Sequence, residues 1–398
     1  MIETDFLVTS ESVSKAHPDK LCDRVSDAIL DKYLECDEYS RVAIETMISN
    51  NVLFIAGEVT SKGKVDIDKV AKEVLKESGY DRENVGFNCN KCLIFKNINK
   101  QSTDIDLGVS HNNKVGAGDQ GIMYGFACDE TKGFIPITAD LSSKLCEKLD
   151  QIKKNKKNNW LLPDGKAQIT MLYDKDGNPK KISSIIVSTQ HVSGVSYETI
   201  HFTILNEVIY DVIPSKYLSR DTEIYINPTG RFVIGGPEGD VGVTGRKIMV
   251  DTYGGIARHG GGAFSGKDST KVDRSGAYMA RYVAKNIVAA GLARKCEVSI
   301  AYAIGKTDPE MVEVNTFSTE KIPKEYIKAA VNEIFSFSVE DILENLQLRK
   351  PQFLKTAAYG HFGREDQGFK WEETDKAEEL KKIAFLSFVK DFKKNKLI

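Results

Sequence analysis

The alternation of hydrophobic and polar residues predicts a unit of two helices around a β-hairpin near the start of the chain. Its expected elements are a helix at 18–36, strands at 41–48 and 52–59, a helix at 66–78 and a strand at 92–95. Apolar residues recur at helical spacing in the two helices, and they alternate or run continuously in the strands. Pro18 suits the first turn of a helix, and Asn50-Asn51 is typical of a hairpin turn.

The same order of elements returns twice further along the chain. The second unit is expected to contain a helix at 141–152, strands at 168–173 and 183–189 and a helix at 197–212. The third is expected to contain a helix at 274–290, strands at 297–304 and 311–317 and a helix at 324–336. Three such units predict the α+β class, with antiparallel or mixed sheets packed against helices. The lysine-rich end at 376–398 predicts a surface helix.

Composition and charge restrict the classes of protein to which this chain can belong. With 398 residues, 41% of them hydrophobic and 28% charged, the chain is long enough for several domains with cores of their own. The formal net charge of −2 lacks the basic excess of a dedicated nucleic-acid binder. No apolar run approaches the roughly 18 residues of a membrane span, and residues 1–10 lack the features of a secretory signal. We therefore expect a cytoplasmic protein with no nucleic-acid or membrane partner.

Glycine and cationic residues alternate through the segment 230–262. Glycines permit unusual backbone angles and let main-chain N–H groups approach a ligand, while the interspersed Arg, Lys and His residues supply positive charge. This combination suits a polyphosphate. The alternative is a set of tight turns with solvated charges, which explains any single glycine better but the whole segment less well.

Residues 261–267 match the spacing GxxxxGK of a P-loop. The next residue is Asp268, whereas that motif needs a Ser or Thr hydroxyl for magnesium. A P-loop also joins a strand of a parallel sheet directly to a helix, and the preceding stretch here is a glycine-rich loop. We interpret the match as informative in composition but accidental in topology.

His17-Pro18-Asp19-Lys20 stands at the expected start of a helix, where backbone N–H groups and the helix dipole favour anions. The commoner reason for a first-turn acid is that it complements the dipole. The functional interpretation is that Asp19 holds Mg²⁺ on a phosphate while His17 and Lys20 contact a nucleotide. Asp273 offers a second carboxylate for metal ions that bridge a polyphosphate, with paired charges on a solvated helix as the alternative.

Seven motifs spread from Ser10 to about Trp371 resemble those of the S-adenosylmethionine synthetase family. They are Ser10-Glu11-Ser12-Val13, His17-Pro18-Asp19-Lys20, Gly116-Ala117-Gly118-Asp119-Gln120-Gly121, Pro228-Thr229-Gly230-Arg231-Phe232, Thr244-Gly245-Arg246-Lys247, the nonapeptide 260–268 and Tyr359-Gly360-His361-Phe362-Gly363-Arg364. Together they are far more specific than any single glycine motif.

The resemblance implies three similar α+β domains in a pseudo-threefold arrangement, interleaved in space, at 1–105, 116–233 and 234–375; the basic helix expected at 376–398 follows from the sequence pattern. It implies an active site between two subunits of a homodimer or homotetramer. The implied reaction joins L-methionine to ATP: the thioether sulfur attacks the ribose C5′ and expels the triphosphate, which is then cleaved to pyrophosphate and phosphate. Because a thioether needs no deprotonation, positioning and charge stabilisation are expected to dominate.

The resemblance also implies roles for individual residues. The residues implied to bind ATP, with Lys20 added from its place in the helix start, are His17, Lys20, Asp164, Lys166, Arg231, Phe232, Asp240, Arg246, Lys247, Ala263 and Lys267, of which His17, Lys166, Arg246 and Lys267 are expected to act in catalysis. The residues implied to bind methionine are Glu58, Gln101, Asp119, Asp240 and Lys271. The cation ligands are expected to be Asp19 and Asp273, for two Mg²⁺ per site, and Glu45, for K⁺.

A few residues depart from the usual pattern of that family. Lys15-Ala16 replaces a usual Glu-Gly, Thr103 replaces a usual Pro, and Leu162 stands where the family often has Arg. Thr103 lies in 101–115, a stretch that resembles a mobile loop over the site, so the rate of loop movement is the property most affected.

Two other functions are open from the sequence. A P-loop phosphotransferase would convert ATP to ADP, and Asp268 argues against it. A non-catalytic, nucleotide-binding regulatory subunit would be expected to have lost ligands, whereas every family ligand that can be placed is present.

Overall fold

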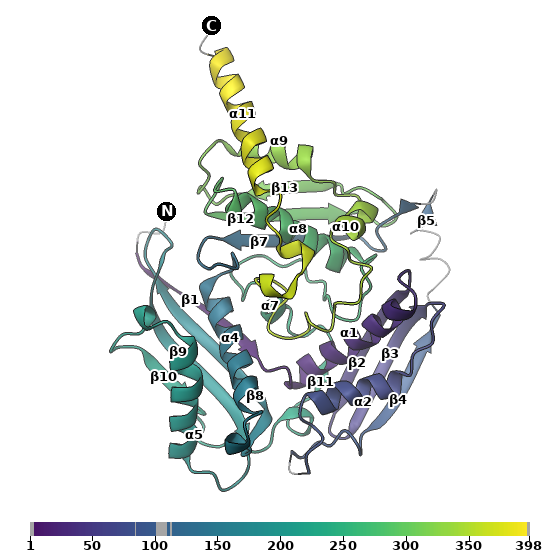
Figure 1. Ribbon diagram of the computed structural model, residues 1–398, viewed down its shortest axis with the longest axis vertical. Helices are drawn as coiled ribbons and strands as arrows, with labels where there is room; N and C mark the ends of the chain where they lie inside the picture. The colour runs from purple at the N-terminus through teal and green to yellow at the C-terminus, as the bar shows by residue number, and fades with distance from the viewer. Residues whose placement is uncertain (1–3, 84, 101–109, 112–113, 396–398) are drawn as a thin grey trace.

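Three helix–hairpin–helix units surround the middle of the molecule in the computed structural model (Figure 1), which describes residues 4–83, 85–100, 110–111 and 114–395. Their sheets are antiparallel or mixed, and helices pack against them. The predicted α+β class is therefore confirmed. Most predicted elements agree with the observed ones to within a few residues at each end.

The first unit begins with a long helix that carries much of the candidate site. Its elements are α1 (Pro18–Cys36), β2 (Arg41–Ser49), β3 (Val52–Thr60), α2 (Ile67–Glu77) and β4 (Leu93–Asn99). β2 and β3 are antiparallel, whereas β3 and β4 are parallel. Asn50 has a φ of +48° in the hairpin turn, the left-handed conformation that such turns require. The side chain of Asp66 accepts the N–H of Lys69 and so caps α2.

The second unit is built around a long antiparallel hairpin. Its elements are α4 (Ile137–Ile152), β8 (Leu161–Tyr173), β9 (Pro179–His191), α5 (Tyr197–Ile204), a π-helical turn at 205–209, α6 (Tyr210–Val212) and β10 (Glu223–Ile226). β8 starts well before the predicted strand at 168–173. Its first half contains Pro163-Asp164-Gly165, residues that seldom occur in strands, and the pairing register shifts there.

The third unit contains a long buried helix and the C-terminal elements. They are α7 (Ile248–Asp251), α8 (Val272–Ala289), β12 (Lys295–Tyr302), β13 (Met311–Asn315), α9 (Lys324–Ile334), α10 (Val339–Asn345) and α11 (Ala377–Asn395). α11 packs on α9 and then extends away from the body (Figure 1). No helix among the described residues is long and apolar enough to cross a membrane.

Each of the three larger sheets takes one strand from a segment outside its own unit. β1 (Phe6–Val13) pairs with β8 of the second unit, β7 (Gly121–Cys128) with β12 of the third, and β11 (Gly242–Val243) with β2 of the first. The units are therefore tied together by strand exchange around the molecule. β11 matters most for the site, because it brings the glycine-rich cationic segment next to α1.

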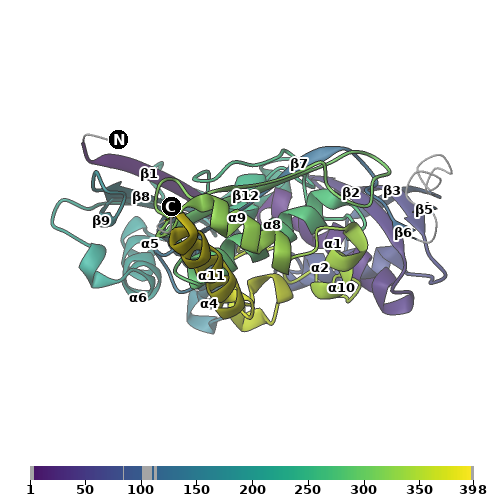
Figure 2. The same cartoon turned by 90° about the horizontal axis from the view of Figure 1, so that it is seen from above.

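The sheets and helices form two layers. Seen from above, the sheets lie along one side of the molecule and most helices along the other (Figure 2). In the first unit, Leu53 and Ile55 are buried beneath the helices, whereas Phe54 between them is 48% exposed. The second face of this sheet is therefore not covered by helices of the same chain.

Candidate active site

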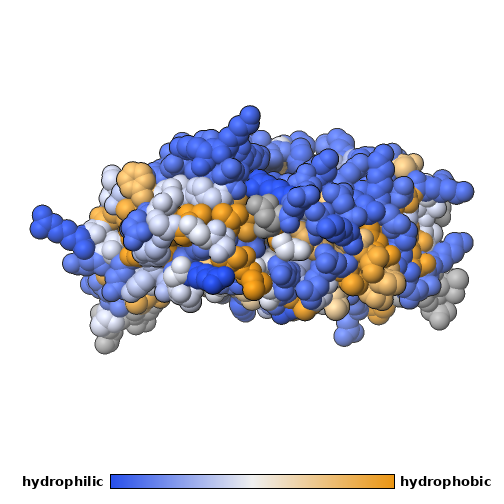
Figure 3. All heavy atoms as spheres, turned by 90° about the horizontal axis from the view of Figure 1, so that it is seen from below, coloured by the Kyte–Doolittle hydropathy of each residue, from blue (hydrophilic) through white to orange (hydrophobic). Residues whose placement is uncertain are grey.

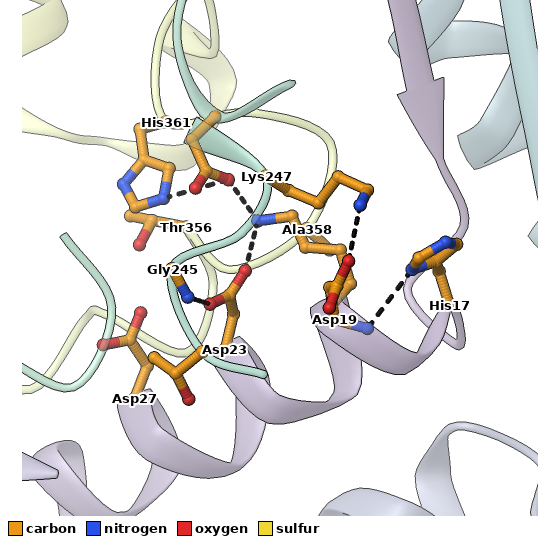
Figure 4. A network of polar contacts seen from close by, with 12 residues as sticks. His17, Asp19, Asp23, Asp27, Gly245, Lys247, Thr356, Ala358 and His361 are labelled. Carbon is orange, nitrogen blue, oxygen red and sulfur yellow. Dashed lines mark hydrogen bonds and ion pairs between the residues drawn. The ribbon is translucent and has the colours of Figure 1, made fainter. Parts of the chain in front are cut away.

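A row of aspartates along α1 holds the segments that carry the candidate cations. Asp19, Asp23, Asp27 and Asp31 recur every four residues and so lie on one side of the helix. Each accepts backbone N–H groups from residues more than 200 positions further along the chain: Asp19 from Val243 at 3.0 Å, Asp23 from Gly245 at 2.8 Å, Asp27 from Gly266 at 2.8 Å, and Asp31 from residues 352–354 at 2.9 Å. Figure 4 shows the first three of these aspartates on α1.

Asp19 is at the centre of the first group of site residues. Lys247 Nζ lies 2.5 Å from Asp19 Oδ2, and Arg246 Nε lies 3.9 Å from Oδ1. Burial alone would raise the pKa of Asp19, but the hydrogen bonds from Lys247 and from the Val243 N–H hold it below its ordinary value. Asp19 therefore stays ionised beside two cations, one of which, Arg246, is 55% exposed.

His17 caps α1 and remains neutral. Its Nδ1 accepts the N–H of Asp19 at 3.2 Å, so the proton of the neutral ring belongs on Nε2. Burial, together with the nearby Lys247 and Lys166, lowers its pKa to about 3. His17 is thus a hydrogen-bond donor through Nε2 at neutral pH, and Lys166 of β8 belongs to the same neighbourhood.

Lys20 lies in the protein interior and pairs with two acids. Its ammonium group lies 3.0 Å from Asp23 Oδ2 and also contacts Asp251, and all three side chains are almost completely buried. Burial opposes the charge on Lys20, but the two carboxylates raise its pKa above the ordinary value. Burial and Asp251 raise the pKa of Asp23 to about 6. The predicted contact of Lys20 with a nucleotide stays a prediction, and its geometry favours a structural role.

This network extends to the motif near the end of the chain. His361 is completely buried, and its Nδ1 lies 2.8 Å from the Tyr278 hydroxyl. Its Nε2 lies 3.6 Å from Asp251 Oδ1, and Figure 4 shows His361 beside the aspartates of α1. Burial lowers the pKa of His361 well below its ordinary value, and Arg274 adds to the effect. His361 is therefore a neutral part of the interior.

A second group of site residues surrounds the start of α8. Lys267 Nζ lies 2.6 Å from Asp273 Oδ2, and both side chains are about one quarter exposed. Gly262 lies so close to Asp273 that an added Cβ would be 2.2 Å from its Oδ1. Lys271 pairs with Asp268 at 2.5 Å. The second group is thus again a set of lysine–carboxylate pairs beside a glycine-rich loop.

Glu58 and Lys267 lie on opposite sides of the same residue of β2, in the sheet of the first unit. Glu58 on β3 lies opposite Ala43 on β2, and Ala43 forms an isolated bridge with Lys267. Glu45 lies two residues from Ala43 on the same open face of the sheet. Both glutamates therefore lie near the second group. Asp119 is exposed just before β7, whose Gly121 lies close to Asp273.

Most of the remaining predicted nucleotide ligands lie in or beside the segment 231–240. Asp164 is buried, and its carboxylate accepts the N–H groups of Gly236 at 2.9 Å and Gly165 at 2.7 Å. Phe232 donates its N–H to His191 Nε2 at 3.1 Å. Arg231 and Asp240 are exposed, and Ala263 lies against Gly245, which makes the two glycine-rich loops neighbours. Gln101 lies outside the described residues, as does Thr103.

The geometry at 261–267 does not match a P-loop. Gly266 and Lys267 run beside β2, with the Ile44 N–H bonded to Gly266 O at 2.9 Å, and α8 begins only at Val272. Asp268 is buried and accepts the N–H of Val42 at 2.8 Å. The aspartate that disagreed with the P-loop motif is therefore part of the fold.

Sequence reasoning did not identify the roles of Asp23, Asp27, Asp31 and Asp251. The four-residue spacing of the acids on α1 was a signal in the sequence, since acids rarely lie on the buried face of a helix without partners. It could not show which distant N–H groups they accept.

The fold and these paired lysines and carboxylates on glycine-rich loops define a class: an α+β protein of three similar units with a candidate site rich in cations and carboxylates. The chain matches three family models along its length: the S-adenosylmethionine synthetase N-terminal domain at 5–103, the central domain at 114–232 and the C-terminal domain at 234–373.

Curated relatives agree with these matches. The chain is 55% identical over 381 residues to S-adenosylmethionine synthase 1 of Rhodospirillum rubrum. The aligned region covers 96% of this chain and 99% of the relative. It is 53% identical over 376 residues to S-adenosylmethionine synthase 1 of Rhodopseudomonas palustris, covering 94% and 98%. The chain belongs to the S-adenosylmethionine synthetase family, whose members are methionine adenosyltransferases.

Proposed function

We propose that this protein forms S-adenosylmethionine from ATP and L-methionine. The observation that supports this proposal most is the pairing of Lys247 with Asp19 and of Lys267 with Asp273, at 2.5 and 2.6 Å, on loops held by the aspartates of α1. Lys247 of the first pair and both members of the second pair are partly open to solvent. A triphosphate needs such a combination of cations and metal-binding carboxylates.

The reaction is a displacement at carbon that needs no base. A lone pair of the methionine sulfur forms the C–S bond to C5′, the C5′–O bond breaks, and its electron pair leaves with the triphosphate. Negative charge grows on the leaving oxygen, so Arg246 and Lys267 are proposed to stabilise the transition state. His17 supplies a neutral donor through Nε2, and Lys166, near enough to affect its pKa, is proposed to add positive charge.

Water then cleaves the bound triphosphate to pyrophosphate and phosphate. The sulfonium product is positive, which suits acids nearby, and Glu58, Asp119 and Asp240 are proposed to contact the methionine portion together with Lys271. Arg231, Phe232, Asp164, Lys247 and Ala263 are proposed to complete the nucleotide site. Gln101 is assigned to methionine from the resemblance alone.

Asp19 and Asp273 fit Mg²⁺ that is shared with a substrate. No group of three or more His, Cys, Asp or Glu side chains that could hold a metal occurs among the described residues. Mg²⁺ commonly binds through one or two carboxylates plus phosphate oxygens, which is the donor set that these aspartates and a triphosphate would provide. When bound, two Mg²⁺ would neutralise phosphate charge. Glu45, on the open sheet face, is the proposed K⁺ ligand.

We also propose that two copies of the chain pair through their open sheet faces to form a homodimer, alone or within a homotetramer. The open face of the first sheet carries four large apolar residues that are 47 to 61% exposed, namely Met47, Phe54, Leu93 and Phe95. Hydrophobic surface is visible on the side of the molecule where β3 and β4 lie (Figure 3). Apolar patches of this kind mark protein–protein contacts. The first group of site residues, around Asp19 of one copy, would then face Glu58 and the second group of the other copy.

Mixing two variants tests the shared site. Asp19→Asn and Glu58→Gln are each expected to be nearly inactive, and heterodimers should regain activity because half of their sites combine two intact groups. Subunit exchange is verified separately with tagged chains. Activity equal to the sum of the two parents, despite exchange, would mean that each chain contains its complete site.

The fate of ATP tests the reaction itself. Phosphorus NMR of a mixture of protein, ATP, methionine, Mg²⁺ and K⁺ should show equal amounts of pyrophosphate and phosphate and no ADP. Omitting methionine should abolish most of this turnover. Accumulation of ADP would support phosphoryl transfer, and no turnover by the folded protein would support a regulatory subunit.

A further inference from the structure

A separate cavity of about 90 Å³ lies between the first and second units, and cations dominate its lining. We call it the basic pocket. Its charged residues are Lys15, Arg82, Lys153, Lys154, Glu77 and Asp150, and Leu162 and Pro163 form part of its wall. None of these residues was assigned to the adenosyl-transfer site above. Lys15 and Leu162 are also two of the departures that the sequence showed.

Both acids of the basic pocket already have cationic partners. Asp150 Oδ1 lies 2.9 Å from Lys153 Nζ, while its Oδ2 accepts the N–H of Lys15 at 3.0 Å and the Tyr359 hydroxyl at 2.8 Å. Glu77 lies 3.6 Å from the buried Arg24. Within the described structure, Lys153 therefore neutralises Asp150 and Arg24 neutralises Glu77.

Three cations of the lining are left without a carboxylate. Lys15, Arg82 and Lys154 form no ion pair among the described residues, and the Arg82 guanidinium donates to the carbonyl oxygen of Leu161 at 3.3 Å. Lys15 is partly buried, and this burial, with Arg24 next in effect, lowers its pKa below the ordinary value. In a chain whose net charge is −2, the basic pocket is a local excess of positive charge with unused donors.

We propose that the basic pocket binds a phosphate-sized oxyanion. A water needs roughly 10 to 15 Å³ of such space, so about 90 Å³ holds a small tetrahedral anion but no nucleotide. The ammonium groups of Lys15 and Lys154 and the planar guanidinium of Arg82 are the donors that phosphate oxygens accept most strongly. The anion is either free phosphate or the terminal phosphate group of a small metabolite. This site does not depend on the adenosyl-transfer reaction.

Equilibrium dialysis with radiolabelled inorganic phosphate tests the proposal on the full-length protein at constant ionic strength. The wild type and Lys267→Ala, which alters the other phosphate-binding region, should both bind at the basic pocket. Lys15→Gln and Lys154→Gln should each weaken this binding about tenfold, which corresponds to ~1.4 kcal/mol. Lys154 is exposed, so its variant remains informative if Lys15→Gln folds poorly.

Two results would overturn the proposal. One is phosphate binding that is unchanged in both pocket variants; the other is binding lost in Lys267→Ala alone, which would place the anion in the ATP region. Repeating the dialysis with glycerol phosphate as competitor identifies the source. Competition as strong as that of phosphate indicates a terminal phosphate group, and weaker competition indicates the free ion; both results keep the site.

Discussion

Replacing Lys20 by methionine is expected to destabilise the protein by about 4 kcal/mol near pH 7. The change removes the cation that lies between Asp23 and Asp251, whose side chains are 0% and 2% exposed. Breaking a buried ion pair by removing one partner costs about 3–5 kcal/mol, because a charge is left without a counter-charge. The variant could instead fold with one of the two aspartates protonated. At pH 7 an aspartate is about three pH units above its ordinary pKa, and at ~1.4 kcal/mol per unit its protonation costs about 4 kcal/mol, a similar amount.

The cost should depend on pH, and the sign distinguishes lost charge from lost packing. In the variant the folded state raises the pKa of the two aspartates further, so it holds protons that the unfolded chain releases above about pH 4. Folded stability contributed by this proton is lost as pH rises. The deficit of Lys20→Met against the wild type should therefore be smaller near pH 5 than near pH 8.

Urea unfolding followed by circular dichroism at both pH values measures this difference. Lys32→Met is the matched control on the same helix, because Lys32 is 45% exposed and its pair with Glu35 should contribute under ~1 kcal/mol. The double variant Lys20→Met/Asp23→Asn should recover much of the loss. A deficit below ~1 kcal/mol, or one that does not change with pH, would refute the reasoning.

The other predictions concern the site directly. Lys267→Ala and Arg246→Ala should each lower kcat by about 100-fold or more, which corresponds to ~3 kcal/mol, with little change in the urea midpoint. If both variants unfold instead, these loops are structural. A magnesium chelator should abolish activity, and Glu45→Gln should remove most of the response to K⁺ while leaving a slower basal rate. The pKa of His17, about 3, lies below its ordinary value, so folded stability should fall as pH drops below about 6.5. For His17→Asn, the urea midpoint should differ less between pH 5 and pH 7 than it does for the wild type. An equal difference in both proteins would contradict this.

Local patterns predicted the elements of each unit well. α1 has the predicted bounds because Pro18 begins it and apolar residues keep helical spacing to its end. β1 and β7 were not predicted. β7 contains Gly121 and Gly125, which weaken a strand pattern, and Gly125 is required because an added Cβ would be 2.0 Å from the backbone of Ala280 on α8. That requirement comes from packing between distant segments.

The chemistry of the site could be predicted in kind but not in arrangement. The glycine-rich cationic segment indicated a polyphosphate, and the motifs indicated the family. The position of Lys20 beside His17 and Asp19 suggested a ligand, yet its ammonium group is enclosed by two acids, one of them more than 200 residues away. Long-range hydrogen bonds, such as that from Gly245 to Asp23, have no local signature in the sequence.

The central claim is that this protein joins the sulfur of methionine to C5′ of ATP. Carbon-13 NMR of methionine labelled in its methyl group, incubated with the purified protein, ATP, Mg²⁺ and K⁺, tests it directly, because the methyl resonance moves when the thioether becomes a sulfonium. The account predicts an S-adenosylmethionine signal that grows with time and is nearly absent with Lys267→Ala. A methyl resonance that stays at the position of methionine, while the folded protein consumes ATP, would contradict it.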